Sequence, residues 1–252
     1  MDQLHLSDTS HHSLHSISTY TLAKVKHQIL RLLCVTGCAC AANVALAAPV
    51  SWVDWTAFTA GFTDGTATGT VSSAGLTVNY SGEVYNIDTQ VDGTGTDYWA
   101  PDSTWADGSI IDNAPPGTDI IALRGSTGST NTITFSQPVT NPFMAVYSLG
   151  RDSLEVTYEF NSPFDVIVGG GSSTNGGSSV VELPGNILSG IEGNGTIQFL
   201  GTFTSISYTV PTNESWHGFT VGVQQVPLPP AVWLFGSGLL GLVGMAHRTK
   251  AA

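Results

Sequence analysis

The sequence predicts an all-β protein, an antiparallel β-sandwich of jelly-roll-like type, flanked by an N-terminal signal peptide and a C-terminal transmembrane sorting helix. Three observations predict this. Apolar and polar residues alternate through the middle of the 252-residue chain, with turn-forming residues about every ten positions. No apolar stripe of helical spacing is sustained there. Both ends differ in composition from the middle, which divides the chain into 1–47, 48–225 and 226–252.

The middle segment contains runs in which every second residue is apolar. The runs expected to form strands are Leu76–Tyr80, Thr132–Phe135, Leu154–Phe160, Thr196–Phe199, Phe203–Val210 and Trp216–Val223. Half-apolar strands of this kind pack as two antiparallel sheets around one core. Two stretches rich in Gly and small polar residues, Asp88–Pro116 and Gly169–Ser179, are predicted to be loops.

The N-terminal segment has the pattern of a secretory signal. A cationic stretch, Leu22–Arg31, precedes a short apolar stretch, Leu32–Ala42, and Ala45-Leu-Ala47 supplies the small residues that signal peptidase prefers. We expect cleavage after Ala47, because cleavage after Ala48 would place Pro49 first. The alternatives are lipidation at Cys38 and a buried amphipathic helix.

The C-terminal segment has the pattern of a membrane anchor. Val226-Pro-Leu-Pro229 is followed by the uncharged stretch Ala231–Ala246 and then by the basic residues Arg248 and Lys250. As a helix this stretch would rise about 24 Å, slightly less than a bilayer core. The terminal cations would stay in the cytoplasm, which places the preceding domain outside.

At these residues the chain resembles the PEP-CTERM sorting segments, in the variant that opens Val-Pro-Leu-Pro. The resemblance implies a secreted bacterial protein, associated with extracellular polysaccharide, that an exosortase cuts near Val226–Pro229. It covers about the last 25 residues and lacks a literal Pro-Glu-Pro. Residues 195–223 more weakly resemble the last strands of β-sandwich proteins with this tail. The alternatives for residues 226–252 are an ordinary hydrophobic terminal helix and a plain single-span anchor.

Charge and cysteine content limit the kinds of partner and chemistry expected of the domain. Between residues 48 and 225 there are 17 Asp and Glu and only two cations, Arg124 and Arg151, for a formal charge of −15. Such a surface repels nucleic acid and suits a hydrated matrix, cations or simple solubility. The three cysteines all lie before residue 41, so disulfides and thiol chemistry are not expected in the domain.

No enzyme is predicted. The domain has one histidine, His217, and Glu214-Ser-Trp-His217 lies at the entry to a strand, where neighbouring side chains point to opposite faces. No Gly-x-Ser-x-Gly motif accompanies it. The acidic residues could supply a glycosidase pair, but with 17 of them proximity alone indicates nothing.

Two weaker binding hypotheses concern the first loop. Asp88, Asp92 and Asp97 open an Asp- and Gly-rich stretch whose oxygen ligands would suit Ca²⁺, although solvated turn residues are the simpler interpretation. Trp99 and Trp105 could stack on sugar rings, or could be buried anchors of the loop. Trp52, Trp55 and Trp216 are expected to pack in the structure. No cofactor is expected apart from this possible calcium.

Taken together, the sequence predicts a non-enzymatic surface or biofilm-matrix protein. It is expected to be anchored in the inner membrane before processing, and afterwards to be on the cell surface or extracellular. Its expected partners are signal peptidase, an exosortase and extracellular polysaccharide. The alternatives are a carbohydrate-binding module and, less favoured, a secreted hydrolase.

Overall fold

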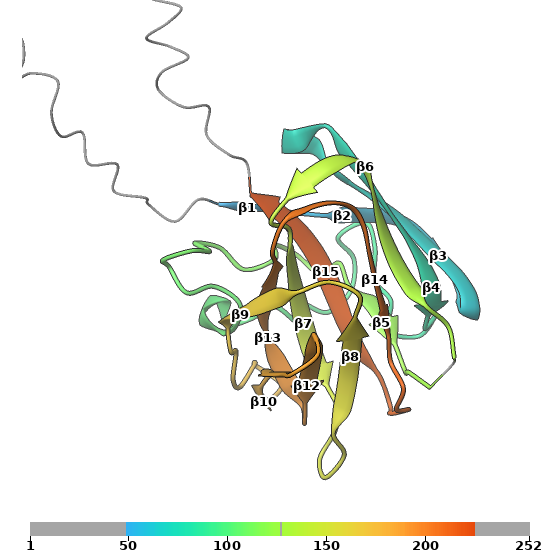
Figure 1. Cartoon of the computed structure of the whole chain (residues 1–252), viewed down its shortest axis with the longest axis vertical. Coiled ribbons are helices and arrows are strands. Elements are labelled where there is room, and N and C mark those ends of the chain that lie inside the picture. The colour runs from blue at the N-terminus through green and yellow to red at the C-terminus, as the bar shows by residue number, and fades with distance from the viewer. Residues whose placement is uncertain (1–48, 127, 225–252) are drawn as a thin grey trace, which may run out of the picture. The chain divides into compact units, whose positions relative to one another are not determined.

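The computed structural model describes residues 49–126 and 128–224. The predicted signal peptide with Ala45 and Ala47, and the predicted sorting segment with Val226, Pro227, Leu228, Pro229, Arg248 and Lys250, lie outside these residues. Within them no helix is long and apolar enough to cross a membrane. The described chain consists of strands, loops and two short 3-10 turns, η1 (Ser72–Ala74) and η2 (Asp102–Thr104), which confirms the all-β prediction (Figure 1).

The strands form two sheets. The seven-stranded sheet has the order β1-β15-β7-β13-β10, with β5 also paired to β15 and β9 to β13. Its strands are β1 (Val50–Trp52), β5 (Ile121–Leu123), β7 (Phe143–Leu149), β9 (Phe164–Val168), β10 (Ser178–Ser179), β13 (Gly193–Phe199) and β15 (His217–Gln224). All its pairings are antiparallel except the short β10–β13 contact.

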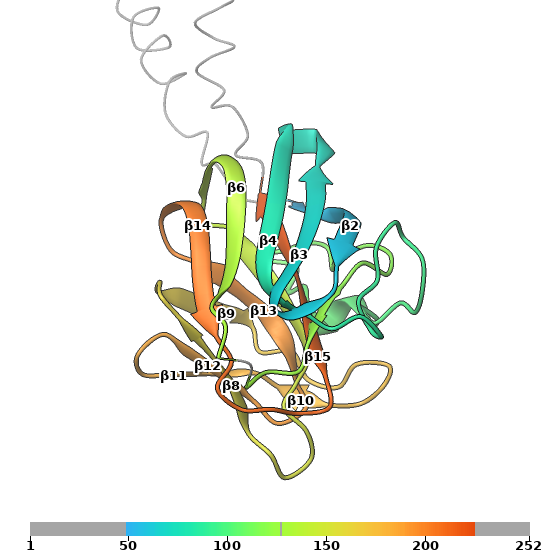
Figure 2. The same cartoon turned by 90° about the vertical axis from the view of Figure 1, so that its right-hand side faces the viewer.

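The eight-stranded sheet has the order β11-β12-β8-β14-β6-β4-β3-β2 and is antiparallel throughout. Its strands are β2 (Asp54–Thr59), β3 (Gly61–Val71), β4 (Leu76–Val84), β6 (Asn131–Thr140), β8 (Val156–Phe160), β11 (Val181–Leu183), β12 (Ile187–Gly190) and β14 (Thr202–Thr209). Figure 2 shows β14, β6, β4 and β3 side by side. Each of the six runs predicted from alternation lies largely within a strand.

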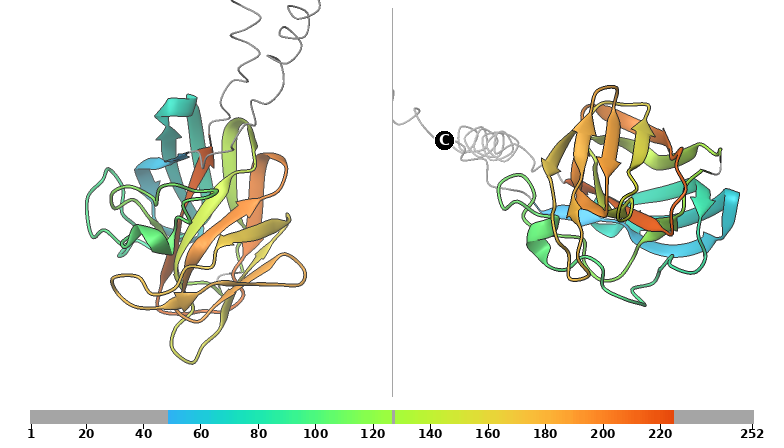
Figure 3. Two further views of the ribbon diagram at one scale, coloured as in Figure 1. Left: turned by 90° about the vertical axis from the view of Figure 1, so that its left-hand side faces the viewer. Right: turned by 90° about the horizontal axis from the view of Figure 1, so that it is seen from below.

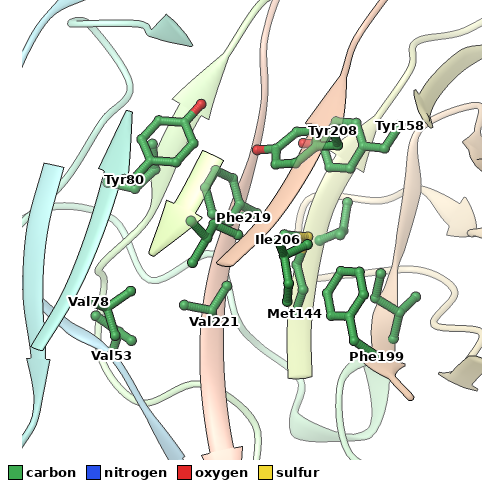
Figure 4. Packing of buried hydrophobic residues seen from close by; sticks show 14 of the residues in the cluster. Val53, Val78, Tyr80, Met144, Tyr158, Phe199, Ile206, Tyr208, Phe219 and Val221 are labelled. Carbon is green, nitrogen blue, oxygen red and sulfur yellow. The ribbon is translucent and has the colours of Figure 1, made fainter. Parts of the chain in front are cut away.

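The main core draws residues from both sheets, as expected of a β-sandwich. The inward residues of β4, such as Val78 and Tyr80, share one buried cluster with Met144 of β7 and Phe219 and Val221 of β15 (Figure 4). These residues follow the period of two in their strands, because successive side chains of a strand point to opposite faces. The alternation seen in the sequence therefore corresponds to a real inner face.

A second, smaller core lies on the other face of the seven-stranded sheet. The outward residues Phe143, Ala145 and Tyr147 of β7 are covered by Trp99 and Trp105 from the loop between β4 and β5. This loop is drawn in the green tones that follow β4 in Figure 3. The seven-stranded sheet is thus buried on both faces, which explains why β7 is apolar at almost every position.

Candidate functional site

The two tryptophans considered for glycan contact are interior residues. Trp99 is 2% exposed and Trp105 is fully buried. Their indole Nε1 groups donate to the carbonyls of Asp119 and Val146, each at 3.2 Å, and their rings meet edge to face at 5.3 Å. Their burial agrees with the alternative that they are anchors of the loop, and it gives no support to the hypothesis that they stack on sugar rings. They anchor the loop to the sheet.

The residues predicted as calcium ligands take part in the local structure of the loop. Asp97 accepts the backbone N–H of Trp99, and Asp92 adopts a left-handed φ of 56°. Burial raises the pKa of the Asp88 carboxyl. Among residues 49–126 and 128–224 no group of three or more His, Cys, Asp or Glu could hold a metal ion. The calcium hypothesis gains no support from this arrangement and stays a prediction.

Glu214 and His217 do meet, although the sequence suggested opposite faces. The chain turns before β15, so that Nδ1 of His217 and Oε1 of Glu214 lie 2.6 Å apart, and both residues are buried. Glu214 also accepts the N–H of Gly150 at 2.7 Å. A carboxylate paired with an imidazole can orient a base for catalysis. Here both side chains are buried, and the imidazole packs against Tyr158 of the eight-stranded sheet.

Further ionisable groups surround this pair. Glu83 of β4 is fully buried and accepts N–H groups from Arg124 and Gly125 at 3.0 and 2.8 Å. Burial raises the pKa of the Glu83 carboxyl, and these two hydrogen bonds oppose that shift. Burial also raises the pKa of Tyr80, Tyr158 and Tyr208 well above the ordinary tyrosine value. Figure 4 shows the three rings at one end of the core.

This polar group is part of the fold rather than an accessible site. The hydroxyl of Tyr80 donates to the carbonyl of Glu83 or to Oδ1 of Asn131, each 2.8 Å away. His217 contacts Tyr158 ring to ring at 5.3 Å. Because Glu83 belongs to one sheet and its backbone donors follow β5 of the other, the carboxylate ties the two sheets together.

The accessible feature with a regular chemical character is the outer face of the eight-stranded sheet. In the regularly paired parts of β3, β4, β6 and β14 the residues that alternate with the core are hydroxyl-bearing, with a single Asn, and all are exposed or half-buried. We call this set the hydroxyl face: Thr66, Thr68, Thr70, Thr77, Asn79, Ser81, Thr132, Thr134, Ser136, Ser205, Ser207 and Thr209. None of these side chains is charged or large and apolar. Phe62 and Asp64 of β3 are also exposed, but they lie beyond the register shift of that strand.

Strand register arranges the hydroxyl face in rows. One row crosses Thr68, Asn79, Thr134 and Ser205, and the next crosses Thr66, Ser81, Thr132 and Ser207. Neighbouring strands lie about 4.8 Å apart, and same-face residues along a strand about 6.8 Å apart. Side chains within rows hydrogen-bond: Thr68 donates to Asn79 at 3.0 Å, and the Thr132 and Ser207 hydroxyls lie 3.1 Å apart. The result is a regular, neutral grid of donors and acceptors.

The hydroxyl face ends in a hollow of about 430 Å³. It lies where β8 pairs with β14 at only two residue pairs, and Gly185 of the turn between β11 and β12 borders it. Asn161 extends the pairing, since its N–H donates to the Ser207 carbonyl and its Oδ1 accepts the Ser207 N–H. The lining consists of Thr130, Glu159, Phe160, Asn161, Gly185, Ile187, Ser207, Tyr208 and Thr209.

Comparison with known proteins adds no assignment. The chain matches no family model, no curated protein and no solved structure. The site therefore has to be interpreted from its own residues.

Sequence reasoning did not identify the hydroxyl face, although a signal for it is present. Thr66-Ala-Thr-Gly-Thr70, Thr132-Ile-Thr134 and Ser205-Ile-Ser-Tyr-Thr209 all carry a hydroxyl at every second position. Each run by itself indicates only a strand with a solvated face. The shared surface depends on which strands are neighbours, and that order is fixed by long-range pairing.

Proposed function

We propose that this protein is an exported, non-enzymatic component of a bacterial surface or extracellular matrix, sorted by its PEP-CTERM-like tail. In this proposal a signal peptidase removes residues 1–47 and an exosortase acts at Val226–Pro229. The helix of residues 231–246 holds the chain in the inner membrane until then, and extracellular polysaccharide is the matrix it joins. No cofactor is part of the proposal.

The observation that carries the proposal is the position of the two ends of the sandwich. Strand β1 begins at Val50, three residues after Ala47, and β15 ends at Gln224, two residues before Val226. The two strands pair antiparallel, with Val50 opposite Gln224. The described domain therefore begins and ends on two neighbouring strands, each close in sequence to one of the proposed processing points, which supports attachment of the domain by either end.

Other features agree with a stable, passive body outside the cell. The domain has no cysteine that could form a wrong disulfide, and its charge of −15 keeps it soluble. Consecutive strands from β4 to β9 alternate between the two sheets, as in the jelly-roll-like winding that we include in the proposal. The one carboxylate–imidazole pair described is buried, which favours a binding or structural role over hydrolysis.

Mass spectrometry of the protein from its producing cells tests this proposal. We expect a mature chain that starts after Ala47 and ends between Val226 and Pro229, and a variant with these four residues changed to Ala should keep residues 231–250. Residues 231–250 in the mature wild-type protein would refute processing. Delivery of a chain ending at Gln225 to the same place as the full-length protein would refute sorting by the tail.

A further inference from the structure

We infer that the hydroxyl face and the adjoining hollow form a binding surface for a neutral polysaccharide chain. The inference deepens the proposed matrix role by naming the partner's chemistry and the residues that meet it. It rests on the proposed function only for the place where the protein and the polysaccharide would meet, outside the cell. The binding itself would be a property of the domain.

The first argument is the distribution of charge. The domain carries 17 acidic residues, yet the twelve side chains of the hydroxyl face are uncharged, and the charged residues beside them on neighbouring strands are acidic: Asp54 pairs with Thr70, and Glu159 pairs with Thr209. Such an uncharged area on a strongly acidic body does not attract cations, and the surrounding field repels polyanions such as acidic polysaccharides and nucleic acids. The partner that this field leaves is a neutral molecule.

The second argument is the chemistry of the side chains. Protein–protein interfaces have a core enriched in aromatic and other large apolar residues, which this face lacks. Hydroxyl and amide groups at Thr134, Ser205 and Asn79 can each donate and accept hydrogen bonds, as can the hydroxyls of a sugar. Their methyl and methylene groups offer small apolar contacts to sugar C–H groups. A neutral polyhydroxylated surface therefore matches a neutral polyhydroxylated ligand.

The third argument is the shape of the area. A single hydrogen bond exchanged with water contributes only about 0.5–1.5 kcal/mol, so one sugar ring on the grid would bind weakly. A polymer that follows the rows adds many such contacts at once. The hollow then gives one end a fixed position, with the Glu159 carboxylate and the Asn161 amide as hydrogen-bonding groups and Ile187 as an apolar contact. Its volume of about 430 Å³ is within the range of small-molecule binding pockets.

The test is affinity electrophoresis of the full chain, in a detergent without a sugar headgroup, through gels containing a soluble β-glucan, a galactomannan or dextran. We expect retardation by at least one neutral polymer and none by alginate, an acidic one. Thr134→Glu, at an exposed position in the middle of the grid, should weaken binding about tenfold, since the new carboxylate stays hydrated and displaces the chain. Oligosaccharides of the retarding polymer should bind more tightly as they lengthen.

The control variant is Ser179→Glu, which adds the same charge at an exposed strand position of the other sheet. It should bind like the wild type, and both variants should unfold within a few degrees of it. Equal weakening by the two variants, or no retardation by any neutral polymer, would overturn the inference. The inference would also be overturned if the wild type self-associated and Thr134→Glu did not, because the hydroxyl face would then bind a second copy of the chain. Binding of the wild type to ice, and not to any glycan, would overturn it as well. None of these results would alter the mass-spectrometric outcome on sorting, so the two proposals fail separately.

Discussion

The two sheets of this sandwich share one core but differ on their outer faces. The outer face of the seven-stranded sheet is covered by the long loop that carries Trp99 and Trp105, whereas the outer face of the eight-stranded sheet is open and lined with hydroxyls. The burial of the strands shows this difference. β7 is buried at nearly every position, whereas in the first half of β6 buried residues alternate with exposed or half-buried ones. A continuous apolar strand therefore marks a covered sheet face, and an alternating strand marks an exposed one.

Replacing Trp105, the main anchor of the loop, should have the largest effect on the stability of the domain. Trp105→Ala deletes a fully buried indole that stacks against Tyr147 and donates to the Val146 carbonyl. We expect the free energy of unfolding to fall by about 3–5 kcal/mol, because a cavity of this size cannot close completely. Chemical denaturation followed by circular dichroism measures this loss.

Trp216→Ala is the matched control for that prediction. Trp216 also stacks on Tyr147 but is only half-buried, so its removal exposes less new surface and should cost clearly less stability. If Trp105→Ala cost no more than Trp216→Ala, the loop would not be held on the sheet by a second core. The contrast between the two outer faces would then disappear.

Glu83 provides a test of how the sheets are joined. Burial raises the pKa of its carboxyl in the folded state. A raised pKa means that its stabilising contribution is complete below the unfolded value of about 4.3 and is lost as the pH rises through the folded value. The wild type should therefore lose stability as the pH rises above about 4, and Glu83→Gln should lose less over the same interval.

The substitution has a second, pH-independent effect. The N–H groups of Arg124 and Gly125 bond different carboxylate oxygens, so the NH2 group of a glutamine would face one of these donors, and that buried donor would lose its partner at a cost of about 1–3 kcal/mol. Chemical denaturation at several pH values gives the free energy of unfolding of each protein as a function of pH. The pH-independent cost is a constant difference between the two proteins, and the titration of Glu83 is a difference that changes with pH. A difference that stays constant over the whole range would show that the protonation of Glu83 is not coupled to folding.

Much of the fold could be predicted from sequence because its signal is local. The alternation in Val156–Phe160 and in Phe203–Val210 reflects which side chains face the core, and a strand shows this within a few residues. Two strands that sequence reasoning did not name show this signal weakly or not at all. In β3 the hydroxyl residues alternate with Ala67 and Gly69, which are too small to mark an apolar face, and β7 is apolar on both faces.

The candidate site was less predictable because it depends on contacts between distant segments. Trp99 and Trp105 resemble exposed loop aromatics until β7 is known to lie beneath them. Glu214 and His217 meet only because the chain turns just before β15. The open choice for the tryptophans and the wrong expectation for Glu214 and His217 have the same cause: a residue's neighbours along the chain do not determine which other strand or loop covers it.

The smallest expected effects come from making one substitution on each outer face. Thr196 of β13 is buried beneath the loop and its hydroxyl donates to the Trp105 carbonyl at 2.9 Å, so Thr196→Val should cost about 1–2 kcal/mol by removing that bond's donor. Thr134→Val makes the same change on the hydroxyl face, where water replaces any lost contact, and should alter the free energy of unfolding by no more than about 0.5 kcal/mol. Thermal and chemical unfolding of the two variants measure the difference directly. Equal losses at the two positions would mean that the hydroxyl face is covered in the protein as purified, which would remove the surface on which a polysaccharide is expected to bind.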